Sequence, residues 1–255
     1  MTLLQVNNLV VEFPHRRGTL RALDKISFDI APGEILGVVG ESGAGKSLTG
    51  AAIIGLLEPP GRVAGGEILL EGQRIDNLGF DAMRPIRGRK IGAIFQDPLT
   101  SLNPLYTIGR QLVETIQTHL NVSADEARRR AIDLLKETGT PAAEQRIDQF
   151  PHQFSGGMRQ RVVIALALAA EPKLIVADEP TTALDVSIQA QIISLLKRLC
   201  RDHGAAVMLV THDMGVIAET CDRVAVMYAG RVAEIGPVHD AVSYTHLTLP
   251  TKRIV

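Results

Sequence analysis

The chain has 255 residues, which suits one large domain or a core domain that carries a smaller insertion. Hydrophobic residues make up 45% and charged residues 22%, as in an ordinary globular core rather than a disordered chain. The 27 Lys and Arg residues nearly balance the 28 Asp and Glu residues, which argues against general binding to nucleic acid or to a membrane surface. The longest apolar run, residues 162–170, is well short of the roughly 18 residues that span a bilayer.

The start of the chain and its cysteines suggest the compartment. The first six residues contain neither the basic segment nor the long apolar segment of a secretory signal, so we expect the cytoplasm. The two cysteines, Cys200 and Cys221, are too few for a disulfide framework and lack the spacing of a zinc site. We expect both thiols to be packing residues.

Strands dominate the first part of the chain. Short apolar stretches between turn residues predict antiparallel strands over 3–6, 9–13 and 22–30. A continuous apolar run at 34–39, closed by a glycine-rich turn, predicts a strand that is buried on both faces. We expect a helix from Lys46 to about Leu57, because the two prolines that follow forbid its continuation.

Strands and helices then alternate. Apolar runs predict strands at 66–72, 91–95, 174–177 and 207–210, and a hairpin over 224–235. Helices are expected over 127–136, 155–170 and 186–203. A capping box of Ser123 and Glu126 begins the first of these helices, and Gly204 ends the last one. This order predicts an α/β fold with a mostly parallel sheet, an N-terminal antiparallel β subdomain and a helical subdomain inserted at about 97–170.

One glycine-rich segment fits the phosphate-binding pattern G-x-x-x-x-G-K-[ST], and it lies between a predicted strand and a predicted helix. Its backbone N–H groups can surround phosphate oxygens, Lys46 can reach the β and γ phosphates, and the Ser47 hydroxyl can ligate Mg²⁺. The predicted nucleotide-binding residues of this P-loop are Gly40, Glu41, Ser42, Gly43, Ala44, Gly45, Lys46, Ser47 and Leu48.

Two adjacent carboxylates, Asp178 and Glu179, end a predicted buried strand. We expect Asp178 to hold Mg²⁺ and Glu179 to polarise an attacking water as general base. Without the P-loop, a solvated loop would be the better interpretation of such a pair. No Lys is followed two residues later by Asp, so the guanine-reading element of GTPases is missing and ATP is the expected nucleotide.

Further segments resemble those of ABC-type ATPases. Residues 154–160 look like a variant of the LSGGQ signature, just ahead of the acidic strand. Gln96 resembles the Q-loop glutamine, Asp185 resembles the D-loop aspartate of the segment 183–185, and His212 resembles the switch histidine. The resemblance covers roughly residues 3–238.

This resemblance implies a head-to-tail dimer with two nucleotides at the interface. The turn of Ser155, Gly156 and Gly157 in one subunit would close on the ATP that is bound to the P-loop of the other subunit. The resemblance also implies that Asp185 is a nucleotide-binding residue.

The same resemblance implies roles for the remaining side chains. Gln96 would contact Mg²⁺ and the attacking water, and His212 would contact the γ-phosphate. Phe13 is a candidate for stacking on adenine, although the strand alternation permits it equally as a core residue.

Three longer segments, 95–104, 151–161 and 178–187, resemble the dipeptide, oligopeptide and nickel importer branch. This implies a second ATPase subunit, two transmembrane permeases and, indirectly, an extracytoplasmic solute-binding protein, with no nucleic acid partner. The chain would lie peripherally on the cytoplasmic face of the inner or plasma membrane. The alternative is a soluble ABC ATPase that acts on a macromolecular partner, and residues 97–150 could also be a solvated helical hairpin.

The C-terminal residues depart from the family pattern. The family continues toward a His-Pro-Tyr-Thr segment and a longer extension, sometimes with cysteines that bind an iron–sulfur cluster, and this chain shows neither. We therefore expect an ABC ATPase domain over 1–242 and a truncated or non-native tail over 243–255.

Overall fold

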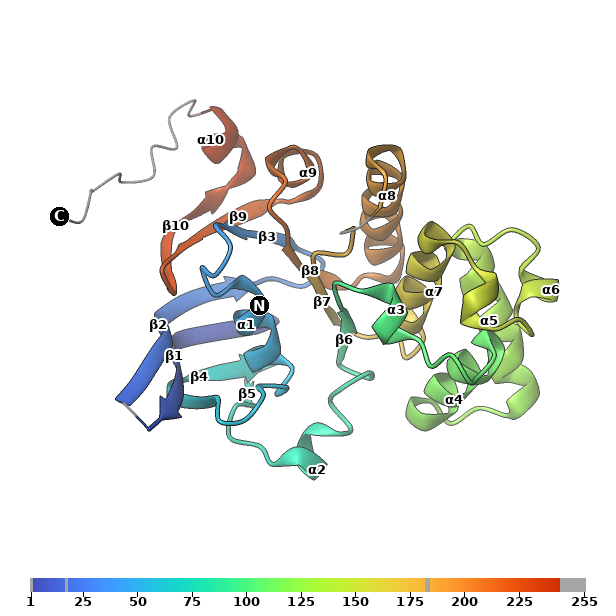
Figure 1. Ribbon diagram of the computed structural model, residues 1–255, viewed down its shortest axis with the longest axis horizontal. Coiled ribbons are helices and arrows are strands. Elements are labelled where there is room, and N and C mark those ends of the chain that lie inside the picture. Colours follow the sequence, from blue (N-terminus) through green and yellow to red (C-terminus); the bar gives the residue numbers. More distant parts are fainter. Residues whose placement is uncertain (1, 17, 182–183, 244–255) are drawn as a thin grey trace.

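The computed structural model describes residues 2–16, 18–181 and 184–243, so the predicted tail beyond Ser243 lies outside the described residues. Figure 1 shows two sheets side by side, with helices α3 to α7 gathered to the right of β6 and β7. One sheet has the strand order β2-β1-β4-β5, and the other has the order β10-β9-β3-β8-β7-β6. The α/β fold with a parallel and an antiparallel sheet is confirmed.

The strands are β1 Leu4–His15, β2 Gly18–Ile30, β3 Ile35–Gly40, β4 Arg62–Leu70, β5 Gln73–Arg74, β6 Ile91–Ile94, β7 Leu174–Asp178, β8 Ala206–Val210, β9 Arg223–Tyr228 and β10 Arg231–Pro237. The α-helices are α1 Lys46–Ile53, α2 Phe80–Met83, α3 Pro98–Ser101, α4 Ile108–His119, α5 Ala124–Glu137, α6 Ala143–Arg146, α7 Gly156–Leu168, α8 Val186–His203, α9 Met214–Thr220 and α10 Val238–Ser243.

Strand β1 joins two of the predicted apolar stretches. Leu4 and Val6 are fully buried, and so are Leu9 and Val11, so the buried positions change from even to odd numbers within the strand. The change occurs around Asn8, which has a φ of 48° and lies where the register with β2 shifts. Such a β-bulge keeps both apolar stretches on the buried face of the sheet.

Strands β3, β6, β7 and β8 are parallel, and the side chains of β8 alternate between two cores. On β8, Val207 and Leu209 pack in a core with α7 and α8, whereas Met208 and Val210 pack in a core with α1 and the antiparallel sheet. The continuous apolar runs of the sequence predict this burial on two faces. Because the strands are parallel, the loops after their carboxyl ends meet at one edge of the sheet.

Helix α1 ends at Ile53, so the expectation of a helix to about Leu57 is wrong. The Arg87 guanidinium donates hydrogen bonds to the carbonyl oxygens of Ile54 (2.8 Å) and Gly55 (2.6 Å), and Gly55 has a φ of 68°. These contacts satisfy carbonyl groups at the C-terminus of the helix before the prolines are reached.

Other helix ends match the sequence more closely. Helix α8 has the predicted bounds, and Gly204 has a φ of 67° at its C-terminus. Ser123 Oγ accepts a hydrogen bond from the Glu126 N–H (3.2 Å), while the Glu126 carboxylate pairs with Arg129 and Arg130. The structure therefore contains one half of the predicted capping box.

The short helices α2 and α9 are absent from the sequence-based prediction, because each offers too few residues for a helical period to be recognised. Both cysteines are free thiols, and Cys200 is buried. No helix among the described residues is both long enough and apolar enough to cross a membrane.

Candidate active site

The glycine-rich loop joins the end of the central strand β3 to the start of α1, in the predicted context. At two positions of the loop, another segment of the chain comes so close that only glycine fits. A Cβ at Gly40, which has a φ of 153°, would lie 2.2 Å from the Met227 carbonyl oxygen. A Cβ at Gly45, which has a φ of 101°, would lie 2.5 Å from the Leu23 side chain. Larger residues at these positions would push the loop away from β9 and β2.

Lys46 is held inside the loop. Its side chain turns back, and its ammonium donates hydrogen bonds to the carbonyl oxygens of Gly40 (2.8 Å) and Glu41 (3.0 Å). The residue is 6% exposed. The loop therefore surrounds a fixed positive charge, which is the arrangement that binds phosphate.

Ser47 and Asp178 meet between α1 and the end of β7. Ser47 Oγ donates a hydrogen bond to Asp178 Oδ1 (2.9 Å). Burial raises the pKa of Asp178 above its ordinary value, and the neighbouring Glu179 carboxylate raises it further, against the opposite effects of Ser47 and Lys46. A hydroxyl and a carboxylate are hard oxygen donors of the kind that Mg²⁺ prefers beside phosphate oxygens. The residues present therefore fit a magnesium ion.

Glu179 receives contacts from two other loops at the same sheet edge. Gln96 Nε2 donates a hydrogen bond to Glu179 Oε2 (3.1 Å), and His212 Nδ1 lies 3.5 Å from Glu179 Oε1. The Glu179 N–H donates to the Val210 carbonyl oxygen (2.9 Å), and Glu179 has a φ of 46°. A non-glycine residue in this region is unusual and is frequent at functional sites. The structure thus brings together three residues that are far apart in the sequence.

A cavity of about 710 Å³ lies over the loop. Its lining joins residues 40, 42, 43 and 45–48 of the predicted loop with Gln96, Glu179 and His212. Of the other two predicted loop residues, Ala44 is 4% exposed, and Glu41 contributes its carbonyl oxygen to Lys46.

The sequence did not predict part of the wall of this cavity. Leu20, Arg21 and Ala22 from β2 line it, as do Ala229 and Gly230 from the turn between β9 and β10. These residues have no motif of their own, and only the pairing of the folded strands brings them to the loop. The hairpin turn at 229–230 was the one signal available, and it did not indicate a position near the P-loop.

The predicted site residues Ser155, Gly156, Gly157 and Asp185 also lie outside the lining of this cavity. Ser155 caps α7 by accepting a hydrogen bond from the Met158 N–H (3.4 Å), and the first residues of α7 are Gly156 and Gly157. A Cβ at Gly157 would lie 3.0 Å from the Ile188 side chain, so the start of α7 packs beside α8, whose N-cap is Asp185. Residues 182–183, which include part of the predicted D-loop, lie outside the described residues.

Phe13 lies beside a second cavity. It is partly buried and packs against the core shared with α1, and a Cβ at Gly61 would lie 2.6 Å from the Phe13 ring. The second cavity, of about 350 Å³, is also lined by Ser47, Leu48 and Asp178. The contact with Gly61 agrees with the alternative that Phe13 is a core residue. Stacking of Phe13 on adenine stays a prediction.

A glycine-rich loop between a central parallel strand and a helix, facing carboxylates at the ends of neighbouring strands, defines the class of P-loop nucleotide-binding proteins. The chain belongs to the ABC transporter family, whose family model matches residues 23–182.

Individual relatives agree with this assignment. The chain is 51% identical over 239 residues to the oligopeptide transport ATP-binding protein OppD of Bacillus subtilis (strain 168), an alignment that covers 93% of this chain and 67% of OppD. It is 48% identical to the dipeptide transport ATP-binding protein DppD of Escherichia coli (strain K12), with 94% of this chain and 73% of DppD covered. A solved structure, the dimeric post-hydrolysis state of the ATP-binding cassette MJ0796 bound to ADP and Pi, superposes with a TM-score of 0.82 at 31% identity, covering 92% of this chain and 99% of that one.

Proposed function

We propose that this chain is the ATP-binding and ATP-hydrolysing subunit of an importer of dipeptides or oligopeptides. The observation that carries the hydrolytic role is the meeting of Gln96 and His212 on Glu179 beside the P-loop cavity. The two peptide-transport relatives, at 51% and 48% identity, support the choice of cargo.

Glu179 is the general base of this proposal. It takes a proton from a water molecule as the water oxygen attacks the γ-phosphorus of ATP, the bond to the bridging oxygen breaks, and ADP and phosphate result. Each carboxylate oxygen can accept more than one hydrogen bond, so a water can bind Glu179 beside Gln96. His212 faces the other oxygen of the same carboxylate, and in this proposal it donates to the transferred phosphoryl group.

The P-loop residues hold and neutralise the triphosphate. Lys46 and the backbone N–H groups of residues 43–48 supply positive charge. Mg²⁺, when bound, neutralises charge on the β and γ phosphates. Ser47 and Asp178, joined by their hydrogen bond, are the residues that would hold this ion, with Gln96 as a further ligand.

A second ATPase subunit completes the site in this proposal. Ser155 and Gly156 are exposed at the start of α7, away from the cavity of their own subunit, so the N–H groups and the positive dipole end of α7 are open to another nucleotide. The dimeric form of the MJ0796 structure supports this arrangement. The nucleotide-binding roles of Ser155, Gly156, Gly157 and Asp185 belong to this dimer.

Permeases are the partners that such a subunit needs. Residues 1–242 form the ATPase domain of the proposal. In the inserted region at about 97–170, helix α7 packs on the parallel sheet, and helices α4 to α6 lie beyond α7, away from the sheets (Figure 1). Leu99 and Leu105 in this region are 61% and 79% exposed, and in this proposal they are the apolar side chains that a permease would cover. Two permeases, a second ATPase and, indirectly, an extracytoplasmic solute-binding protein would place the chain at the cytoplasmic face of the membrane.

Uptake of labelled peptide tests this function. Right-side-out or reconstituted vesicles that contain the chain with its copurifying permeases, with ATP inside and the solute-binding protein outside, are expected to take up a dipeptide or oligopeptide only when ATP is enclosed, and not to take up Ni²⁺. The Glu179→Gln variant should stop transport without disrupting assembly. The proposal would be contradicted if the chain copurified with no membrane subunit, or if Glu179→Gln took up peptide as fast as the unmodified chain. Either result would favour the soluble alternative.

A further inference from the structure

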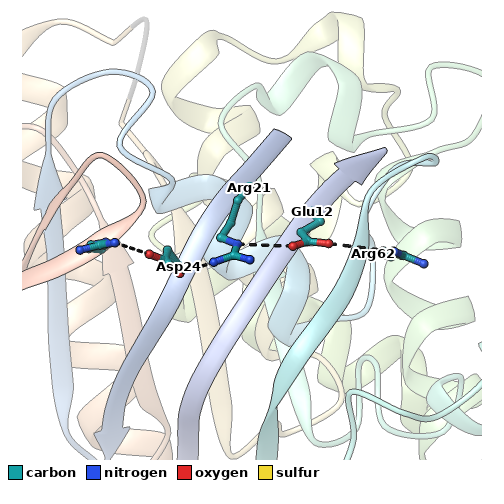
Figure 2. Close-up of polar contacts among 5 residues, drawn as sticks. Glu12, Arg21, Asp24 and Arg62 are labelled. Atoms are coloured by element: carbon teal, nitrogen blue, oxygen red, sulfur yellow. Dashed lines mark hydrogen bonds and ion pairs between the residues drawn. The ribbon is translucent and has the colours of Figure 1, made fainter. Parts of the chain in front are cut away.

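A row of five alternating charges crosses the strands beside the P-loop cavity. We define this charged row as Arg62, Glu12, Arg21, Asp24 and Arg231, which come from β4, β1, β2, β2 and β10 respectively. Figure 2 shows Arg62, Glu12, Arg21 and Asp24 following one another across the strands. Three guanidinium groups and two carboxylates leave one positive charge in excess.

Arg21 occupies the centre of the charged row. Its Nε lies 3.4 Å from Glu12 Oε1, and its Nη1 lies 3.1 Å from Asp24 Oδ1. Each carboxylate also has a second arginine, because Arg62 Nη2 lies 4.0 Å from Glu12 Oε2 and Arg231 pairs with Asp24. Two carboxylates therefore hold the Arg21 guanidinium from two sides and limit its rotamers.

Among the members of the charged row, Arg21 is the one that lines the P-loop cavity. The wall at this point is tied to the loop by backbone hydrogen bonds. The Asp24 N–H donates to the Gly230 carbonyl oxygen (2.8 Å), and the Gly230 N–H donates to the Ala44 carbonyl oxygen (3.1 Å). The position of β2, and of Arg21 on it, is therefore fixed relative to the P-loop.

Arg21 is the second cationic side chain at this cavity, and it is more open to a ligand than Lys46 is. The Lys46 ammonium is enclosed by the carbonyl oxygens of its own loop, whereas the Arg21 side chain is 52% exposed. A guanidinium has five N–H groups, and the contacts with Glu12 and Asp24 use two of them. Donors thus remain on Arg21 for a ligand inside the cavity.

We propose that Arg21 is a further nucleotide-binding residue, which donates hydrogen bonds to the phosphate chain of the bound nucleotide, and that Glu12 and Asp24 are the residues that position it. This inference rests on the proposed function, because it takes the P-loop cavity as the nucleotide site. Phosphate suits this position because a guanidinium presents planar, charge-assisted donors that match phosphate oxygens.

The charged row provides a matched control for the test. Arg21→Gln and Arg62→Gln each remove one guanidinium that contacts Glu12, but Arg62 does not line the cavity. In equilibrium titrations of the full chain with Mg-ATP and Mg-ADP, Arg21→Gln is expected to raise the Kd about tenfold or more, in line with the loss of a charge-assisted hydrogen bond. Arg62→Gln should leave both Kd values unchanged, and equal Kd values in the two variants would overturn the proposal.

Two additional measurements separate a phosphate contact from other effects. Adenosine, which has no phosphate, should bind Arg21→Gln and the unmodified chain equally well, and an equal loss for adenosine would overturn the phosphate contact. The Kd of ATP should depend less steeply on salt in Arg21→Gln than in Arg62→Gln. If Arg21→Gln folds poorly, Arg21→Lys is used instead, and its Kd for ATP is compared with that of the unmodified chain. Equal Kd values would contradict the need for a planar guanidinium.

The titration also distinguishes failure of this inference from failure of the proposed function. Lys46→Ala should abolish ATP binding if the cavity is the nucleotide site. Unchanged binding in Lys46→Ala would overturn the site itself. If Lys46→Ala loses ATP binding while Arg21→Gln binds ATP with unchanged affinity, only the Arg21 contact is overturned.

Discussion

Ser47 Oγ donates a hydrogen bond to Asp178 Oδ1 over 2.9 Å and thereby joins the P-loop to the end of β7, across 131 positions of the sequence. The two oxygen donors that we propose for Mg²⁺ are therefore adjacent in the folded chain. Preorganisation of this kind lowers the cost of assembling the site. It also keeps a carboxylate in a partly buried position, which has consequences for stability.

Asp178→Asn is expected to stabilise the chain and to impair its activity. Burial raises the pKa of Asp178, so the folded chain binds the proton more tightly than the unfolded chain does. The free energy of unfolding therefore falls as the pH rises through the raised pKa, and ionised Asp178 destabilises the chain at neutral pH. Removing this charge should raise the Tm at pH 7, while Mg-dependent hydrolysis should fall roughly tenfold or more.

Thermal unfolding at several pH values checks the first part of this prediction. The Tm difference between Asp178→Asn and the unmodified chain should shrink as the pH is lowered toward the raised pKa of Asp178. Glu234→Gln, a substitution of an exposed carboxylate on β10, is the control and should show no such difference. A lower Tm for Asp178→Asn at pH 7 would contradict the argument from burial.

Glu179→Gln is expected to block hydrolysis and to spare nucleotide binding. The amide can still accept the hydrogen bond from Gln96, but it cannot take a proton from water, so the rate should drop about 10² to 10⁴-fold. Steady-state phosphate release and an ATP titration measure the two effects. Glu219→Gln, on the exposed side of α9, should hydrolyse ATP at the rate of the unmodified chain. An equal rate in both variants would mean that another group is the base.

Gly40→Ala is expected to destabilise the chain because the loop passes so close to β9. The added Cβ would lie 2.2 Å from the Met227 carbonyl oxygen, at a φ of 153°, and relieving such a contact costs about 1–3 kcal/mol. Urea unfolding should show the loss. Gly236→Ala is the control, because no atom lies within 4 Å of its Cβ position, and equal midpoints for the two variants would count against this packing.

Both cysteines are expected to resist alkylation in the folded chain. Burial raises the pKa of the Cys200 and Cys221 thiols to about 12, so almost none of the reactive thiolate is present at pH 8. Iodoacetamide labelling followed by mass spectrometry should find both thiols unmodified in buffer and both modified in denaturant. Rapid labelling of either cysteine in the folded chain would be inconsistent with the packing described.

The sequence by itself predicted those features that depend on neighbours along the chain. The P-loop lies within residues 40–48, and a glycine at the end of a periodic run was enough to place the end of α8 at His203. Buried strands such as β7 were recognisable because both of their faces are apolar. In each case the determining interactions are local or repeat at short spacing.

Only the tertiary structure decided the features that depend on distant residues. The Arg87 guanidinium binds the carbonyl oxygens of Ile54 and Gly55 after helix α1, and no local pattern of the sequence predicts this contact. Phe13 had two possible environments, and its contact with Gly61 depends on the folded sheet. The place of Arg21 on the cavity wall follows from the pairing of β1 with β2 and from the hydrogen bonds that join β2, the Ala229-Gly230 turn and the P-loop. Contacts of this kind form only in the folded chain, between residues that are distant in the sequence. The residue types around each position therefore do not predict them.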